Sequence, residues 1–382
     1  MGKIRIKFGD LNFSEEVIRD ISEVIRSNHI TEGKKVREFE ENWGALFGYK
    51  HNIMVSSGTT ADTAACLALY DFGAKQGDEI IAPALAFAAV GESIEMAGFK
   101  PAFVDIERET LNINPRKIEE NICPRTKAIM AVHTMGKPCD MDAICSIAKN
   151  KNLFVIEDSC EAHGAKFKDR YVGNWGDMAT FSYYVAHLIC TGEGGMVSTN
   201  RADLEQIIRS IKSHGRNPSS VYFDHIRLGF NGKTTDIAAT LGLPQIKNFQ
   251  NIFYIRKRNL YDLLDATKDL SKFAYFNSEN KDEVVCPHAF SITLKEPRLN
   301  ASALRHFLED RGIECKINFR SMPTQQRAFK SLGHSLGDFP EAEYVGDNGL
   351  HIGIHQYLKR EENNDDIKYI SDVLHDYFSK FQ

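Results

Sequence analysis

The sequence lacks the cysteine spacing of a metal centre. Its eight cysteines, at positions 66, 123, 139, 145, 160, 190, 286 and 315, form no CxxC or CxC pair. A disulfide framework is not expected either, because a chain of 382 residues is long enough to bury large apolar cores. We therefore expect reduced thiols and no metal site.

Long apolar runs and dense cationic clusters are also missing. No segment approaches the roughly 18 apolar residues of a membrane span. The N-terminal segment Met1–Arg5 leads into no signal-peptide core. The formal net charge is −5, and no stretch is basic enough to favour nucleic acid or a membrane surface. We expect a cytoplasmic protein with neither kind of partner.

Short apolar runs alternate with helical patterns over the first two thirds of the chain. Such alternation is typical of an α/β fold in which helices cover both faces of a mostly parallel sheet. The last two runs are close enough in sequence to be antiparallel. The expected strands are Asn52–Ser56, Glu79–Ala82, Lys100–Asp105, Ala128–His133, Leu153–Asp158, Met178–Ser182 and Gly195–Thr199.

The pattern changes near residue 250, which predicts a large domain over 1–250 and a smaller α+β domain over 251–382. A helix is expected over Gln245–Ala266, with Pro244 in or just before its first turn, where proline is tolerated. The other expected elements are strands at Phe290–Leu294 and Glu314–Phe319, a helix capped by Asn300 and a last helix from Ile367.

Four polar segments interrupt this background. Ser56–Ala61 (SSGTTA) follows a strand and opens a helix, so it could bind phosphate or simply cap that helix. Asp158 ends the run VIED, where it could face a ligand or cap a helix. His187 precedes the glycine-rich Thr191–Gly195 and could be a packed side chain or an acid–base group. The loop Gly229–Asp236 could be a surface turn or part of a site.

The order and spacing of these segments resemble the DegT/DnrJ/EryC1/StrS sugar aminotransferase family, over about residues 8–378. The resemblance includes the segment Asn28–Gly33 and the strand Phe103–Ile106. The resemblance implies the fold type I (aspartate aminotransferase) architecture. It also implies a pyridoxal or pyridoxamine 5'-phosphate cofactor.

The resemblance assigns several residues to the cofactor's phosphate. Gly58 and Thr59 look like backbone donors, and Ser182 matches a phosphate-binding hydroxyl. Asn231 matches a residue that reaches the phosphate from the neighbouring subunit. The resemblance therefore implies a homodimer with a shared active site.

Three further residues match positions around the cofactor's ring. Phe87 stands where the family stacks an aromatic ring on the pyridine, and Asp158 where an aspartate holds the ring nitrogen protonated. That charge makes the ring an electron sink. Glu161 occupies a position at which many transaminating relatives carry glutamine.

His187 is the main departure from the family pattern. It lies five residues before Gly192, where transaminating members carry the lysine that binds the cofactor covalently, and no lysine occurs between Lys168 and Lys212. An imidazole cannot form that bond, but it can transfer a proton near neutral pH. The substitution resembles the histidine-bearing subgroup of GDP-4-keto-6-deoxymannose 3-dehydratases.

We therefore predict a 3-dehydratase that uses this cofactor on a nucleotide-linked 4-keto-6-deoxy sugar, in deoxysugar biosynthesis for lipopolysaccharide O-antigen. His187 would be the catalytic acid–base, and glutamate would regenerate pyridoxamine phosphate. Two alternatives stay open: a perosamine-synthase-like aminotransferase with lysine replaced at position 187, and a non-catalytic sensor of sugar nucleotide or cofactor. Candidate contacts to the sugar or diphosphate, each as plausibly structural, are His214, Arg216, Arg320 and His355.

Overall fold

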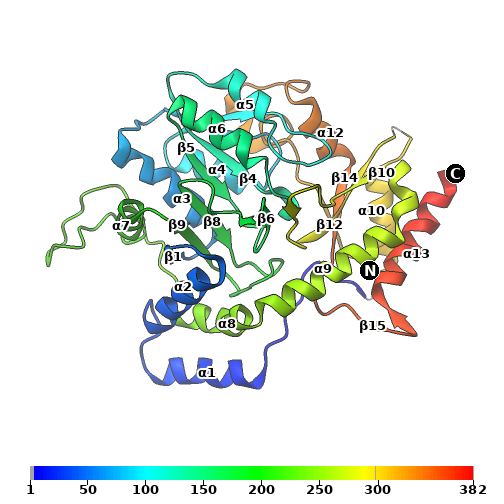
Figure 1. Ribbon diagram of the computed structural model, residues 1–382, viewed down its shortest axis with the longest axis horizontal. Helices are drawn as coiled ribbons and strands as arrows, with labels where there is room; N and C mark the ends of the chain where they lie inside the picture. Colours follow the sequence, from blue (N-terminus) through cyan, green and yellow to red (C-terminus); the bar gives the residue numbers. More distant parts are fainter. Residues whose placement is uncertain (1–3, 297, 382) are drawn as a thin grey trace.

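A seven-stranded sheet lies at the centre of the computed structural model, which describes residues 4–296 and 298–381 (Figure 1). β9 runs antiparallel to both of its neighbours, and the pairs from β8 to β3 are parallel. The predicted mostly parallel sheet and its antiparallel final pair are confirmed. In spatial order the strands are β1 (His51–Val55), β9 (Gly195–Thr199), β8 (Met178–Ser182), β5 (Phe154–Asp158), β4 (Thr126–Val132), β2 (Glu79–Pro83) and β3 (Lys100–Val104).

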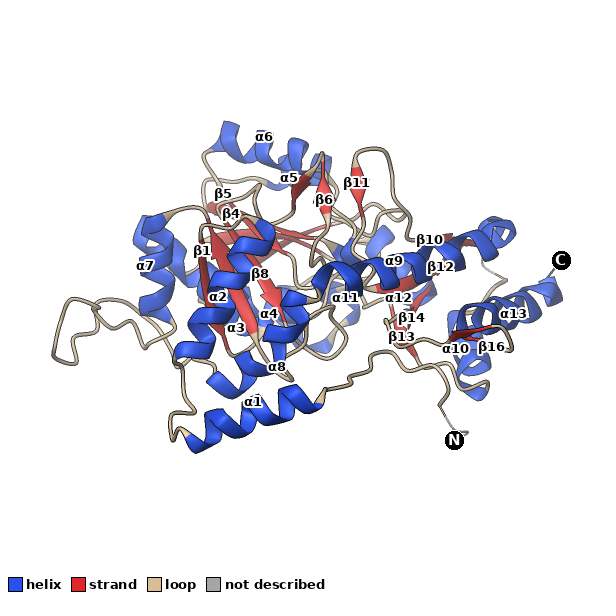
Figure 2. Ribbon diagram, turned by 60° about the horizontal axis from the view of Figure 1, so that its bottom comes forward, coloured by secondary structure: helices blue, strands red, loops and turns tan. Residues whose placement is uncertain are grey.

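Helices cover both faces of this sheet, because side chains alternate across each strand (Figure 2). In β2, Ile80 joins an apolar core with α3, α4 and α7, whereas Ile81 joins a second core with α5 and α6. The bounds of these helices are α3 (Gly58–Ala68), α4 (Ala89–Met96), α5 (Pro115–Asn121), α6 (Met141–Lys151) and α7 (Ala202–Ile211).

A third core packs helices against the β1–β8 end of the sheet. Trp43 of α2 (Lys34–Phe47) is fully buried there with Phe181 of β8, and α8 (Asp236–Lys247) contributes Leu243. The N-terminal helix α1 (Glu15–Arg26) packs on α8. Its exposed face carries Ile18 and Ile25.

The smaller part of the chain is built on a four-stranded antiparallel sheet with its own core. The long helix α9 (Phe249–Ala266) runs from the large part to this one (Figure 1). Ile6 also enters the small core and pairs with Ile313. The other elements are β10 (Ala274–Phe276), β12 (Ala289–Leu294), β14 (Gly349–Gly353), β13 (Cys315–Ile317), α10 (Ala301–Asp310) and α13 (Asp366–Phe378).

Segments between β13 and β14 return to the large core. α11 (Met322–Gln325) and α12 (Pro340–Asn348) place Met322 and Val345 among the buried side chains of the first core. The division of the chain near residue 250 stays a prediction. Short peripheral strands complete the fold: β6 (Lys166–Phe167), β7 (Arg170–Tyr171), β11 (Glu283–Val284), β15 (Arg360–Glu361) and β16 (Asn364–Asp365).

The prediction that a helix begins at Pro244 is wrong. Pro244 lies inside α8, and α9 begins only at Phe249, after Asn248. A proline inside a helix removes one backbone hydrogen bond. Here α8 tolerates the loss because it starts at a Thr235 cap and buries one face against α2.

Two further differences concern the small sheet. The predicted strand Glu314–Phe319 is limited to Cys315–Ile317, because Phe319 adopts a left-handed φ of 49° that extended backbone excludes. β14 was not predicted as a strand. Its sequence, GLHIG, alternates over only three residues between two glycines, and glycine is depleted in strands.

The segment between α7 and α8 projects from the body on the side opposite the C-terminal helices (Figures 1 and 2). This arm, residues 213–235, exposes apolar side chains that few monomers leave uncovered: Val221 and Phe223 are each 85% exposed and Tyr222 is 78% exposed. No helix among the described residues combines the length and apolar character that crossing a bilayer would require.

Candidate active site

A cavity of about 560 Å³ opens where the two parts of the chain meet. Its floor is formed at the carboxyl ends of parallel strands, the edge at which open α/β sheets bind ligands, by Val132 of β4, Asp158 of β5 and Ser182 of β8. The small sheet contributes Lys316 and His351 to the opposite wall.

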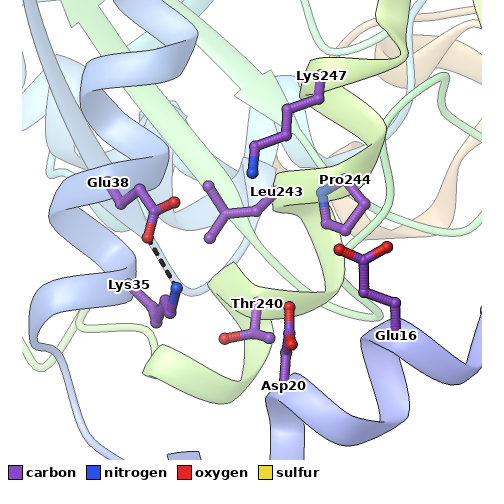
Figure 3. A pocket seen from close by; sticks show the side chains of 8 residues that line it. All are labelled: Glu16, Asp20, Lys35, Glu38, Thr240, Leu243, Pro244 and Lys247. Atoms are coloured by element: carbon purple, nitrogen blue, oxygen red, sulfur yellow. Dashed lines mark hydrogen bonds and ion pairs between the residues drawn. The ribbon is translucent and has the colours of Figure 1, made fainter.

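A second, smaller recess lies between α1, α2 and α8 (Figure 3). Side chains of opposite charge surround it, and Lys35 pairs there with Glu38 at 2.8 Å. It shares no lining residue with the large cavity. We therefore take the large cavity as the candidate site.

One end of the cavity is the start of α3. Ser57 caps this helix by accepting a hydrogen bond from the Thr60 N–H at 3.1 Å. Gly58 and Thr59 begin the helix and line the cavity, and N–H groups at these positions have no acceptor within a helix. A Cβ on Gly58 would lie 2.8 Å from the Ser182 Cβ. The tight packing therefore requires glycine and gives an anion access to the amides.

The two carboxylates that end β5 have different surroundings, because adjacent strand residues point to opposite faces. Glu157 is fully buried and accepts hydrogen bonds from the N–H groups of Gly173, Trp175 and Gly176 at 2.6–2.8 Å. Asp158 faces the cavity instead. Glu157 thus shapes a loop, and Asp158 is free to meet a ligand.

Asp62 of α3 is a site residue that sequence analysis missed. It lines the cavity, is 2% exposed and accepts a hydrogen bond from the Thr180 hydroxyl at 2.6 Å. Its carboxylate, that of Asp158 and the Cys160 sulfur lie within 4.8 Å of one another. Burial and the charge of Asp158 raise the pKa of Asp62 well above its usual value. Its place in the helix after SSGT was the only available signal.

His187 lies in the loop between β8 and β9 and lines the cavity. Its Nδ1 is buried and has no hydrogen-bond partner among the described residues. Burial, reinforced by the neighbouring His288, holds the pKa of His187 well below its usual value. The ring is therefore a neutral base at neutral pH.

Arg256 of α9 fixes the backbone around His187. It is 2% exposed and donates hydrogen bonds to the carbonyl oxygens of Ala186, His187, Pro287 and His288 at 2.8–3.4 Å. Burial lowers the pKa of this guanidinium to about 10. Arg256 therefore ties the His187 loop to the start of β12.

Glu161 lines the cavity but already has partners within the chain. Its carboxylate accepts a hydrogen bond from the Met135 N–H at 2.6 Å and lies 3.3 Å from Nε2 of His288. Burial opposes ionisation of Glu161, but His288 and the Met135 amide outweigh it, and its pKa is lowered. His288, also in the cavity wall, was not identified from the sequence.

The cavity brings together most of the residues that the sequence singled out. Gly58, Thr59, Phe87, Asp158, Glu161, Ser182 and His187 all line it. Asn231, His214 and Arg216 lie in the arm and do not line it, and neither do Arg320 and His355. Burial lowers the pKa of His355 to about 4. The binding roles of all these residues stay predictions.

Comparison with known sequences agrees with the fold and the site. A family model described as the DegT/DnrJ/EryC1/StrS aminotransferase family matches residues 12–371. GDP-4-keto-6-deoxy-D-mannose 3-dehydratase of Yersinia pseudotuberculosis is 31% identical, covering 93% of this chain and 96% of that protein. GDP-perosamine synthase of Escherichia coli O157:H7 is 34% identical and covers 94% of each.

Solved structures give the same result. The E. coli GDP-4-keto-6-deoxy-D-mannose-3-dehydratase with bound hydrated PLP superposes with a TM-score of 0.86 at 27% identity, covering 98% of this chain and all of that one. A His-to-Asn mutant of such a dehydratase, with bound GDP-perosamine, gives a TM-score of 0.85 at 27% identity over 97% of this chain and 100% of that one. The predicted fold type I architecture is confirmed.

Proposed function

The chain belongs to the DegT/DnrJ/EryC1/StrS aminotransferase family, and on that premise we propose that it is a 3-dehydratase of a nucleotide-linked 4-keto-6-deoxy sugar. More broadly, it is a pyridoxal-phosphate-dependent enzyme that modifies nucleotide-linked sugars. The observation that carries the finer proposal is His187, a cavity residue that can move protons but cannot hold the cofactor covalently.

The cavity fits the cofactor that the family uses. The Gly58 and Thr59 amides and the Ser182 hydroxyl would hold the phosphate, because all three groups meet at the cationic end of the α3 dipole. Asp158 would hold the ring nitrogen. It is buried, and no cation among the described residues pairs with it; burial raises its pKa, and a pyridinium would supply the missing charge. Phe87, 64% exposed, is free to cover the ring.

When bound, the cofactor supplies an electron-withdrawing ring that facilitates loss of the sugar's 3-hydroxyl. His187 would accept a proton at its unpartnered Nδ1. Its low pKa favours this step at neutral pH. Arg256 holds the loop by hydrogen bonds to its carbonyl groups and so helps to position His187.

We propose a homodimer as the working unit. The exposed apolar arm, residues 213–235, needs a covering surface, and its Asn231 does not line the cavity of its own chain. A partner's arm would bring Asn231 to the phosphate end of the neighbouring cavity. Glutamate is the proposed amino donor.

Transamination is the second candidate, because the chain is 34% identical to a GDP-perosamine synthase and a lysine lies in the cavity wall. That residue is Lys316 of β13, and it is the only lysine among the described lining residues. Its ammonium group pairs with Glu314 at 2.9 Å and is half-exposed.

A product assay separates the candidates. Purified protein is mixed with pyridoxamine phosphate and GDP- or dTDP-linked 4-keto-6-deoxy sugars. A dehydratase releases ammonia and a 3-deoxy sugar, whereas an aminotransferase forms a 4-amino sugar with glutamate and a sensor only binds. Borohydride reduction with pyridoxal phosphate, followed by peptide mass spectrometry, should label no lysine. A labelled Lys316 would contradict the dehydratase proposal.

A further inference from the structure

Three histidine rings lie in a row beside the cavity. The ring centroid of His187 is 5.7 Å from that of His163 and 5.2 Å from that of His288. The His187 and His288 rings are tilted by only 31°. His163 and His288 are buried and His187 is partly buried, so a charge on one ring acts strongly on the next.

Glu161 extends this row beyond His288. Its Oε1 lies 3.3 Å from Nε2 of His288, while its Oε2 accepts the Met135 amide at 2.6 Å. The backbone amide fixes the direction of the carboxylate. A carboxylate close to one ring nitrogen favours the doubly protonated imidazole. The opposite ring nitrogen then points away from the carboxylate.

The two facing histidines both have an unused nitrogen. Nδ1 of His187 and Nδ1 of His288 are buried and without partners among the described residues. Both residues also line the cavity. Arg256 donates hydrogen bonds to the backbone carbonyls of both residues and so holds their backbones close together.

We propose that Glu161 keeps a proton on His288, so that His288 acts as the proton donor of this cavity and His187 as its proton acceptor. The assignment deepens the proposed function and rests on it for its chemical meaning. An acid and a base are then present at the same pH because two similar rings have different neighbours. Glu161 is a positioning residue in this scheme.

The other charged groups around these rings agree with the assignment. Burial lowers the pKa of His163 to about 3, so this ring is a neutral neighbour of His187. Arg256 adds positive charge beside His187 and disfavours a second proton there. His351 of the small sheet faces Glu161 and His288, with Lys316 on its own sheet close enough to act on it, and burial lowers the pKa of His351 to about 3. The negative charge of Glu161 contributes to the raised pKa of Asp158.

The test is histidine-selective NMR of the cofactor-free protein, with resonances assigned by single variants. In the wild-type protein at pH 7, His288 should show two protonated ring nitrogens and His187 one. In the variants Glu161→Gln and His288→Asn, the pKa of His187 should rise by roughly one unit, because the positive charge on the neighbouring His288 ring is lost. Glu161→Asp keeps the carboxylate and should restore the wild-type value.

His163→Asn is the matched control, because it removes a ring at nearly the same distance from His187 that carries no charge. It should leave the His187 titration nearly unchanged. A neutral His288 in the wild-type protein, or an unmoved His187 in a folded Glu161→Gln variant, overturns the proposal. Neither NMR result depends on substrate turnover. A failed dehydratase assay would contradict the proposed function, and the NMR results would still test the roles of Glu161 and His288 separately.

Discussion

At single positions, burial decides what each titratable side chain of the cavity can do. His187 is a neutral base because it is buried beside other imidazoles and an arginine. Asp62 and Asp158 are both buried, and burial raises the pKa of each above that of an exposed aspartate; the charge of Asp158 raises the pKa of Asp62 further. The residue type alone would have predicted ordinary pKa values for all three.

Replacing His187 by asparagine should reduce turnover by about 10²–10⁴-fold, because a positioned proton-transfer group contributes that much. The variant should fold normally, since the ring makes no side-chain hydrogen bond at Nδ1. Steady-state kinetics and thermal unfolding measure the two effects. His306→Asn, at an exposed position of α10, is the control and should keep full activity. Near-normal turnover of His187→Asn would remove this residue from the mechanism.

Asp62→Asn should stabilise the cofactor-free protein at neutral pH. The raised pKa means that the folded chain keeps a proton that the unfolded chain releases near the ordinary value of 3.8. The stability from Asp62 is thus complete below that pH and is lost as pH rises through the folded pKa. Asparagine is neutral throughout and can still accept from Thr180.

Urea unfolding at pH 4 and pH 7.5 measures this difference. The variant and the wild-type protein should have similar free energies of unfolding at pH 4. At pH 7.5 the variant should be more stable by about 1 kcal/mol or more, one pKa unit corresponding to about 1.4 kcal/mol. An equal gap at both pH values would show that Asp62 is ionised in the folded protein.

Among the elements, α9 has the largest influence on the site although it lies outside the cavity wall. Its Arg256 side chain reaches four carbonyl groups in two separate segments, and no carboxylate among the described residues pairs with it. A buried charge without a counter-ion is costly unless every donor is used. The helix therefore connects the His187 loop to β12 through hydrogen bonds rather than through an ion pair.

Arg256→Leu should lower the free energy of unfolding by about 3 kcal/mol, because several buried carbonyls lose their donors at once. It should also impair turnover through misplacement of the His187 loop. Arg258→Leu, at an exposed position of the same helix, is the matched control and should change stability by less than about 0.5 kcal/mol. Chemical denaturation compares the two. Equal effects would show that the carbonyl contacts of Arg256 contribute little.

For the whole molecule, the position of the arm is the main structural argument for a shared site. Asn231 of the arm does not line its own cavity, and the apolar residues Val221 and Phe223 of the arm are exposed to solvent. A second copy of the chain would cover this apolar surface and bring Asn231 to the other cavity.

Mixed dimers test this arrangement. Asn231→Ala and His187→Asn homodimers should each be impaired, the first mainly in cofactor affinity. Co-expression of the two variants should restore about a quarter of the wild-type activity per site, because half of the dimers are mixed and each has one intact site. Mixtures of the separately purified variants, assayed before exchange, are the control. Absence of recovery in purified mixed dimers would place each site within one chain.

The sequence by itself determined the α/β fold, most strand positions and the residues at the strand ends, because these depend on local periodicity and on the geometry of adjacent residues. Glu157 and Asp158 illustrate this, since strand alternation alone sends them to opposite faces. Only the tertiary structure decided that Asp62 meets Asp158, that His288 meets Glu161 and that Arg256 holds both histidine segments. These partners come from elements far apart in the chain. Their contacts depend on strand order and on the packing of the small sheet against the large one, which no local pattern encodes.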